Sequence, residues 1–199
     1  MPPGNRAAAM ALTREKLIRA ARRAFAEQGF AAASMDELTA GAGLTRGALY
    51  HNFGDKRGLL AAVVAEIDGE MAAKARGAAG AAPDLWSGML AEGETYIRLA
   101  LDPEVQRIVL LDGPAFLGDP SQWPSQNACL AATRDKLDHL QAEGRLKPID
   151  TEAAARLLNG AALNAALWVA ASETPAAVLP AAIAAFTALA EGVLLPSSP

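Results

Sequence analysis

The chain has 199 residues, of which 52% are hydrophobic but only 5% aromatic, and 18 Lys and Arg stand against 22 Asp and Glu. A chain of this length can bury a core of ordinary size, and its many Ala, Leu, Glu and Arg residues predict helix almost throughout. The single cysteine, Cys129, excludes an internal disulfide and fits a reducing cytoplasm.

The charges are distributed unevenly along the chain. Residues 1–58 carry nine Lys and Arg against five Asp and Glu, which leaves nine against seventeen for residues 59–199. A basic first part joined to an acidic remainder predicts that the first part meets a polyanion. On charge alone, a helix with a solvated charged face explains the bias equally well.

The N-terminal residues predict an arm followed by two helices. Residues 1–12 hold two prolines and a glycine, so we expect a flexible arm. Thr13 can cap a helix that runs to Gln28 and stops at Gly29. Ser34, with a glutamate three residues later, forms a capping box and starts the second helix.

A third, short helix is predicted from Thr45 to Gly54. It follows the second helix after a turn with glycine, which is the helix-turn-helix pattern. A helix this short needs an apolar face to pack on, and Leu49 and Phe53 supply one. The outward positions carry long hydrogen-bond donors and one aromatic around a residue without a side chain: Arg46, Gly47, Tyr50, His51 and Asn52.

The middle of the chain predicts helices separated by small residues and prolines. Asp55 caps a longer helix, and Asp84 opens another after a small-residue joint at 77–83. Pro103 suits the first turn of a short helix, and residues 112–124, with three prolines and two glycines, predict a turn-rich segment.

Three more helices are expected, over 125–143, 151–172 and 175–195. The last two are Ala-rich and apolar nearly all round, which implies burial on more than one side. A monomer of this size has little interior to surround both, so a partner subunit is the simplest cover for them. Their uncharged runs are shorter than a membrane span and interrupted by Asn or Pro, so we expect no membrane contact and a cytoplasmic protein.

The sequence offers no catalytic centre. Only His51 and His139 are present, and no nucleophile elbow, phosphate loop or dinucleotide fingerprint occurs. His139 lies near Asp135, Asp138 and Glu143, where a solvated charged face is far more usual than a metal site. We expect no enzyme, no metal and no cofactor.

The polar residues of the short helix fall where a DNA duplex needs them. Thr45 can offer its hydroxyl and the first helix amides to a phosphate. Arg46 can contact a guanine through two hydrogen bonds, and Gly47 permits close backbone approach. The positions that can divide between base edges and phosphates are Tyr50, His51, Asn52 and Lys56. The alternative is that Tyr50 is a packed aromatic and the glycines serve only turns.

Three motifs within residues 13–64 carry a family resemblance. They read Ala-Ala-Arg-Arg-Ala-Phe-Ala-Glu-Gln-Gly-Phe, then Ser-Met-Asp-Glu-Leu, then Gly-Leu-Thr-Arg-Gly-Ala-Leu-Tyr-His-Asn-Phe-Gly-Asp-Lys. This segment resembles the DNA-binding domain of TetR-family transcriptional regulators. The resemblance implies an all-α protein that binds operator DNA through a three-helix N-terminal domain and carries a helical C-terminal domain for ligand binding and dimerisation. It also implies a homodimer through the last two helices, which pair with their mates in a four-helix bundle.

We therefore divide the chain into a flexible arm over 1–12, a helix-turn-helix DNA-binding domain over 13–58 and a ligand-binding and dimerisation domain over 59–199. By resemblance, the residues at or near DNA are Ser34, Thr45, Arg46, Gly47, Ala48, Tyr50, His51, Asn52 and Lys56. Two positions depart from the family pattern. Gly41 stands where alanine is usual, and Asn52 stands where histidine is common.

A largely apolar pocket is expected in the C-terminal domain. It would gather Trp86, Met89, Tyr96, Leu110, Phe116, Trp123, Asn164 and Trp168. Arg156, Gly160, Asn164 and Trp168 recur every four residues, and we expect this stripe to face the interior. The resulting hypothesis is a repressor released from its operator by a small, largely apolar effector. The alternatives are that the aromatics only fill a core, and that the protein is a ligand-independent or architectural DNA-binding protein.

Overall fold

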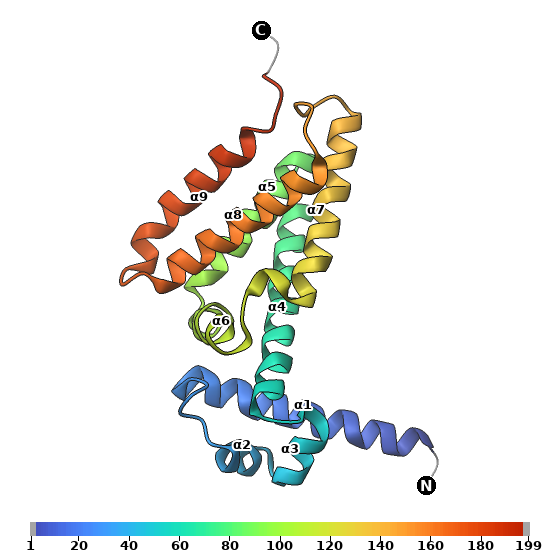
Figure 1. Cartoon of the computed structure of the whole chain (residues 1–199), viewed down its shortest axis with the longest axis vertical. Coiled ribbons are helices and arrows are strands. Elements are labelled where there is room, and N and C mark those ends of the chain that lie inside the picture. Colours follow the sequence, from blue (N-terminus) through green and yellow to red (C-terminus); the bar gives the residue numbers. More distant parts are fainter. Residues whose placement is uncertain (1–2, 197–199) are drawn as a thin grey trace. The chain divides into compact units, whose positions relative to one another are not determined.

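The computed structural model describes residues 3–196, with side chains from residue 7 onward. Every regular element in this range is helical, which confirms the all-α prediction with nine α-helices (Figure 1). They are α1 (Pro3–Gln28), α2 (Met35–Ala42), α3 (Arg46–Phe53), α4 (Lys56–Gly80), α5 (Leu85–Arg98), α6 (Gly113–Leu117), α7 (Pro124–Ala142), α8 (Thr151–Ala171) and α9 (Pro175–Glu191). Two 3-10 turns, η1 (Leu99–Leu101) and η3 (Pro120–Gln122), and a π-helix, η2 (Val105–Asp112), complete the chain.

The described residues form two compact units. The first, here called the head, contains the residues up to 67 together with 107–118, and the second, here called the body, contains residues 68–106 and those from 119 onward. Helix α4 contributes its first part to the head and its remainder to the body. The sequence-based boundary between residues 58 and 59 falls inside this helix.

Helices α1, α2 and α3 pack against one another in the head. Each turns one apolar stripe inward, as the spacing of three and four residues in their sequences dictates. The core that results, with the first part of α4, consists of Leu17, Ile18, Ala21, Phe25, Leu38, Leu49, Leu59, Leu60, Val63 and Ile67, all buried.

Helix α1 begins earlier than the sequence predicted. Residues 3–12, expected to be an arm, are helical, and the Thr13 hydroxyl donates to the carbonyl of Ala9 at 2.9 Å instead of capping the helix. Residues 7–12 are mostly alanine, the best helix former, and a proline is tolerated in the first turn, so the helix extends toward the N-terminus. Residues 1 and 2 lie outside the described range.

The helix-turn-helix has the ends that the sequence predicted. The Ser34 hydroxyl accepts from the Glu37 amide and the Glu37 carboxylate accepts from the Ser34 amide, each at 3.1 Å, which confirms the capping box. Gly43 ends α2 with a φ of 65°. Thr45 then caps α3, its hydroxyl accepting from the Ala48 amide at 3.3 Å.

A segment far along the chain, residues 107–118, completes the head. Its Asp112 carboxylate accepts from the amide of Phe30, in the turn between α1 and α2, at 2.7 Å. The ring of Phe116 lies with its centroid 4.5 Å from that of Phe30, which in turn lies 5.5 Å from Phe25. The turn after α1 is therefore fixed by contacts that are distant in sequence.

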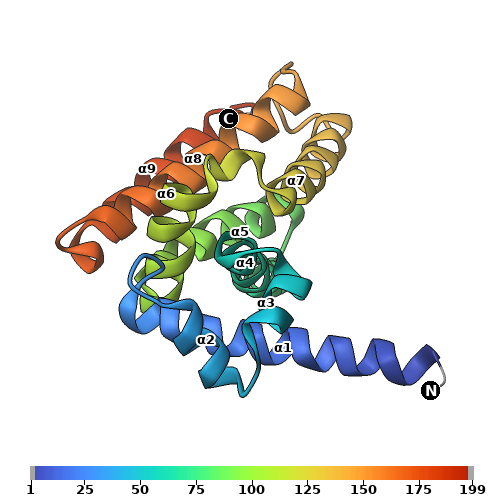
Figure 2. The same ribbon diagram turned by 60° about the horizontal axis from the view of Figure 1, so that its bottom comes forward.

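In the body, α8 packs against α5, α7 and α9, and α8 and α9 run side by side (Figures 1 and 2). The apolar core between these helices consists of Trp86, Met89, Leu137, Leu140, Leu146, Ala154, Ala155, Leu158 and Ala190. Helix α9 ends at Glu191, four residues before the predicted end at 195, and Leu194 then pairs with Leu146 in an isolated antiparallel bridge. Within the described range, none of the helices is both long and apolar enough to span a membrane.

The contact of Arg107 with the turn after α1 can be tested at Gly29. Its φ is 80°, and a Cβ built there would lie 1.9 Å from an Arg107 guanidinium nitrogen, which itself donates to the carbonyl of Gln28 at 3.4 Å. Gly29→Ala should lower the free energy of unfolding by about 1–2 kcal/mol for the left-handed backbone. A further loss is expected because Arg107 must leave its place.

The matched control for this prediction is Gly43→Ala. Gly43 has a φ of 65°, but no heavy atom lies within 4 Å of the added Cβ, so this variant carries the backbone cost alone. Denaturant titration should show the larger loss for Gly29→Ala. Equal losses would mean that the contact of Arg107 with Gln28 adds nothing to stability.

Candidate DNA-binding interface and ligand pocket

Helix α3 is held on the head by its inward side. Leu49 is fully buried, and the half-buried ring of Phe53 lies with its centroid 5.2 Å from the guanidinium carbon of Arg14. The Asn52 amide nitrogen donates to the carbonyl of Ala48 at 2.8 Å, so its donor is used within the helix. These contacts set the rotation of α3 about its own axis.

The opposite side of α3 is open. Thr45, Arg46, Gly47 and His51 are exposed, and Tyr50 keeps 53% of its surface accessible. The nearest atom to a Cβ built on Gly47 is the Thr45 hydroxyl oxygen at 3.7 Å, so another molecule can approach the backbone here. The sequence-based division into an inward Leu49 and an outward polar set agrees with this geometry except at Asn52, which the sequence predicts to point outward but which is half-buried and bonded within the helix.

Arg46 has a partner that the sequence did not reveal. Its guanidinium binds the Asp36 carboxylate of α2 through two hydrogen bonds, of which Nε to Oδ1 measures 2.5 Å. These bonds hold the pKa of Asp36 below its usual value. Both side chains are exposed, so water screens the pair and it adds little to stability. Its effect is to orient the arginine at the start of α3.

Lys56 and Ser34 also have partners within the head. The Lys56 ammonium lies 4.5 Å from the centroid of the Phe30 ring and donates to the carbonyl of Ala31 at 3.3 Å. Burial lowers the pKa of Lys56, and the nearby Asp112 carboxylate opposes this shift. Ser34 is occupied by its capping box, and the small side chain of Ala48 is half-buried.

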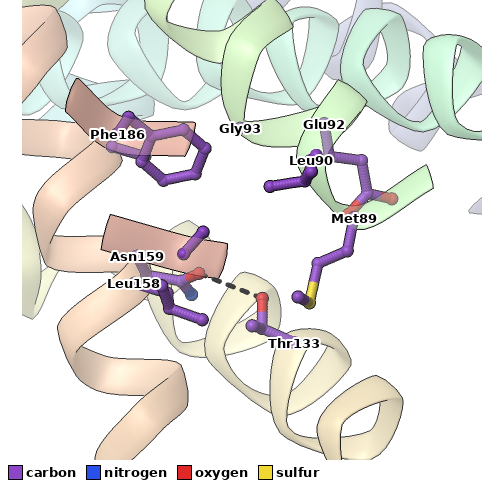
Figure 3. A pocket seen from close by; sticks show the side chains of 10 residues that line it. Met89, Leu90, Glu92, Gly93, Thr133, Leu158, Asn159 and Phe186 are labelled. Carbon is purple, nitrogen blue, oxygen red and sulfur yellow. Dashed lines mark hydrogen bonds between the residues drawn. The ribbon is translucent and has the colours of Figure 1, made fainter. Parts of the chain in front are cut away.

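The body contains a cavity of about 50 Å³ between α5, α7, α8 and α9 (Figure 3). Its apolar wall includes Met89 and Leu90 from α5, Leu158 from α8 and Phe186 from α9. A space of this size holds little more than water, whereas bound organic ligands occupy several hundred cubic ångströms. The body is therefore nearly closed in this conformation.

Polar groups line the other side of the cavity. The Thr133 hydroxyl donates to the Asn159 side-chain oxygen at 3.0 Å, as Figure 3 shows, while the Asn159 amide nitrogen is buried without a hydrogen-bond partner in the protein. Lys136 forms an ion pair with Glu92, and both side chains are largely buried. A guest in the cavity would thus meet an unpaired amide donor next to an internal ion pair.

Gly93 explains how α9 comes so close to α5. A Cβ at this position would lie 2.3 Å from the Cζ atom of Phe186, so only glycine lets the ring reach the cavity. Glycine inside a helix otherwise weakens it. From the sequence, Gly93 is only a glycine within a predicted helix, and its contact with the Phe186 ring could not be predicted.

The residues predicted to line one pocket lie in different places. Met89 lines the cavity, and Trp86 belongs to the adjoining apolar core. Tyr96 and Trp123 belong to the body but not to the cavity lining. Leu110 and Phe116 belong to the head.

Asn164 and Trp168 lie on the outer side of α8. With Arg156 and Gly160 they form the stripe that the sequence suggested would face inward, but all four are exposed. The inward side of α8 is taken by small and branched residues instead, namely Ala155, Leu158, Ala162, Ala166 and Val169. Their close packing against α5, α7 and α9 leaves the larger tryptophan outside.

Nothing in the described part of the chain resembles a metal centre. No three of its His, Cys, Asp and Glu side chains gather closely enough to hold an ion. His139 lies 3.3 Å from the Glu143 carboxylate on the same exposed helix face.

Two protein-family models match the chain. One is described as bacterial regulatory proteins of the tetR family and matches residues 17–63, which include the helix-turn-helix. The other is described as the C-terminal domain of tetracyclin repressor-like proteins and matches residues 86–193, more than half of the chain.

Curated relatives and solved structures agree with these models. The chain is 33% identical over 141 residues to the HTH-type transcriptional repressor Rv1474c of Mycobacterium tuberculosis, covering 69% of this chain and 71% of the relative. It is 30% identical over 136 residues to the HTH-type transcriptional repressor AcnR of Corynebacterium efficiens, covering 68% and 69%. A TetR-family transcriptional regulator from Pectobacterium atrosepticum superposes with a TM-score of 0.86 at 44% identity, covering 95% and 97% of the two chains.

The polar wall of the cavity can be tested with a double-mutant cycle. Thr133→Val leaves the Asn159 oxygen without its donor and should lower the free energy of unfolding by about 1–3 kcal/mol. Adding Asn159→Leu removes the orphaned amide, so the double variant should regain most of that loss. Denaturant titration of the two single variants and the double variant measures the coupling, and simply additive losses would contradict it.

Proposed function

This chain belongs to the TetR family of bacterial transcriptional regulators, and on that premise we propose that it is a homodimeric repressor released from its operator by a small, largely apolar effector. The family consists of DNA-binding regulators and not of enzymes, and the two relatives reported above are named as repressors. The open polar face of α3 is the observation that carries the proposal, because a surface of this kind suits the major groove.

In this proposal α3 enters the major groove with its first residues leading. Thr45 and the amides that follow it meet a phosphate, Arg46 reaches a guanine edge, and Gly47 lets the backbone come close. Tyr50 and His51, both exposed, divide between bases and phosphates. Ala48 lies beside them at the interface.

Three other predicted residues act mainly through the head itself. Asn52 is bonded within α3, Ser34 caps α2, and Lys56 lies on Phe30. Each is placed to orient the recognition helix or to add a phosphate contact beside it. Asp36 must release Arg46, or share it, when the arginine meets DNA.

The proposed dimer uses the outer faces of α8 and α9. Leu157 and Trp168 on α8 are 75% and 51% exposed, and Leu189 on α9 is 66% exposed. Large apolar side chains left exposed on two helices that pack together suit an interaction site, and the many alanines of these helices permit close helix packing. A second copy on this surface would place two recognition helices at half-sites about one helical turn, or a multiple of it, apart.

Effector binding requires a second conformation of the body. The cavity is too small for an organic molecule as it stands. An effector can shift the protein only toward the conformer that it binds more tightly. Release from DNA then follows if that conformer spaces the two recognition helices differently.

The DNA-reading role of Arg46 can be measured on an operator selected from a random DNA library. Arg46→Ala should relax discrimination at one base pair by about 5- to 150-fold, the worth of one bidentate contact. Asp36→Asn removes the competing carboxylate charge and should strengthen binding at low salt. Arg134→Ala, an exposed arginine of the body, is the control. An unchanged base preference in Arg46→Ala would refute the assignment.

The dimer surface can be tested with Leu189→Glu. This change adds a charge to the proposed interface, so light scattering should show a monomer, and operator affinity should fall at least tenfold because two linked half-sites are needed. Leu101→Glu, which alters an exposed leucine of η1 outside α8 and α9, should remain dimeric. A dimer that survives Leu189→Glu would place the interface elsewhere.

A further inference from the structure

The body contains a second group of polar side chains, which we call the Asp68 centre. It consists of Asp68 from α4, Tyr96 from α5, and Ser125, Gln126 and Cys129 from α7. Asp68 is only 3% exposed, in a protein interior where ionisable side chains are rare. The centre plays no part in the cavity lining described above.

One atom of this centre, Oδ2 of Asp68, has no hydrogen-bond partner in the protein. The indole Nε1 of Trp123, two residues before Ser125 in the sequence, is also buried without a partner. Among the buried side-chain atoms of the described residues, only the Asn159 amide nitrogen shares this condition. Natural interiors satisfy nearly all such atoms, so a buried carboxylate oxygen without a partner calls for an explanation.

The groups that shift the pKa of Asp68 include a hydroxyl but no cation. Burial raises the pKa of Asp68, and a hydrogen bond from the Ser125 hydroxyl opposes the rise. Burial also raises the pKa of Tyr96 and, in the same way, that of Cys129, and in both cases the Asp68 charge adds to the shift. Both groups are therefore neutral hydrogen-bonding groups around one carboxyl.

Three further charged groups act on the pKa of Cys129. Glu92 raises the pKa of this thiol further, while Arg76 and Lys136 oppose the rise. Lys136 is already paired with Glu92. The shift in the pKa of Asp68 itself comes from burial and from the Ser125 hydroxyl.

We propose that the Asp68 centre binds the protonated amine of the effector, an ammonium group carried on an apolar body. This inference rests on the proposed function, because it names the chemistry of the effector. The ammonium would donate to Oδ2 of Asp68, balance its charge, and donate further to the Tyr96 hydroxyl or the Gln126 side-chain oxygen.

The apolar part of such a ligand has a place along α7. Cys129 lies one helical turn before Thr133, whose hydroxyl is 3.0 Å from the Cys129 carbonyl oxygen. Since Thr133 lines the cavity, the centre and the cavity adjoin on the same helix. An amine with an apolar tail can therefore extend from Asp68 toward Met89 and Phe186 in a conformer with more room.

Other ligand classes fit the centre less well. A neutral alcohol could donate to Oδ2 but would leave the buried charge unbalanced. Metal sites in proteins usually combine several charged ligands, and among the described residues no three His, Cys, Asp or Glu side chains gather closely enough to hold an ion. An ammonium group can both donate to the unpaired oxygen and balance the negative charge.

The test uses the full-length protein with n-butylamine, n-hexylamine and n-octylamine, and with the alcohols of the same chain lengths. Thermal shift and calorimetry should show that the amines raise the Tm of the wild type and bind more tightly as the tail lengthens, while the alcohols bind at least tenfold more weakly. Asp68→Asn should weaken amine binding at least tenfold. Glu70→Gln, which removes an exposed carboxyl from the same helix, should leave it unchanged.

The unliganded variant separates a binding role from a structural one. Because burial raises the pKa of Asp68, the wild type loses stability as pH rises from about 4 through the folded-state pKa, whereas Asp68→Asn is free of this loss. Asp68→Asn should therefore fold normally by circular dichroism, and its Tm should exceed that of the wild type by a margin that grows with pH. A variant that is less stable at every pH would make Asp68 structural and overturn the proposal.

The other possible results distinguish a failure of the amine assignment from a failure of the repressor proposal. Equal amine binding by Asp68→Asn, equal binding of alcohols, or no binding of any amine each overturns the amine assignment. None of these results bears on operator binding, which the Arg46 experiment measures separately. If the wild type selected no operator, the repressor proposal would fail while the amine titration still decided the chemistry of the centre.

Discussion

The burial of Leu49 is the contact on which the polar face of α3 depends. An eight-residue helix is marginal in water, so its rotation and its position come from packing rather than from its own hydrogen bonds. With Leu49 fully buried against the head, the residues on the other side of the helix must point outward. Thr45 and Gly54 close the two ends, so the face is held in register as well as in direction.

The head depends equally on a segment that lies outside its own stretch of sequence. Within η2, Gln106 donates to the carbonyl of Ala170 in the body at 2.8 Å, while the next residue, Arg107, donates to Gln28 in the head. Asp112, a turn further on, holds the amide of Phe30. Gln106 is thus bonded within the body and its neighbour Arg107 within the head, so the boundary between the two units falls inside η2.

The body combines tight apolar packing with polar groups that the packing does not satisfy. Ala-rich inner faces bring α8 close to its neighbours and leave a cavity of only about 50 Å³. Asp68, Trp123 and Asn159 nevertheless keep unpaired buried atoms, a costly arrangement for a purely structural core. In a family of regulators, such unmet hydrogen-bonding capacity is where an effector can gain more from one conformer than from the other.

The sequence by itself determined the helical class, the capping box at Ser34, the cap at Thr45 and the inward Leu49, because these follow from short-range rules of spacing and hydrogen bonding. Local rules also misplaced the start of α1, since Thr13 reads as a cap although the alanines before it extend the helix. Only the tertiary structure decided that Asp36 holds Arg46, that Trp168 faces outward and that Asp68 is buried with one oxygen unpaired. Each of these facts depends on how separate helices pack, and periodicity within one helix carries no information about its partner.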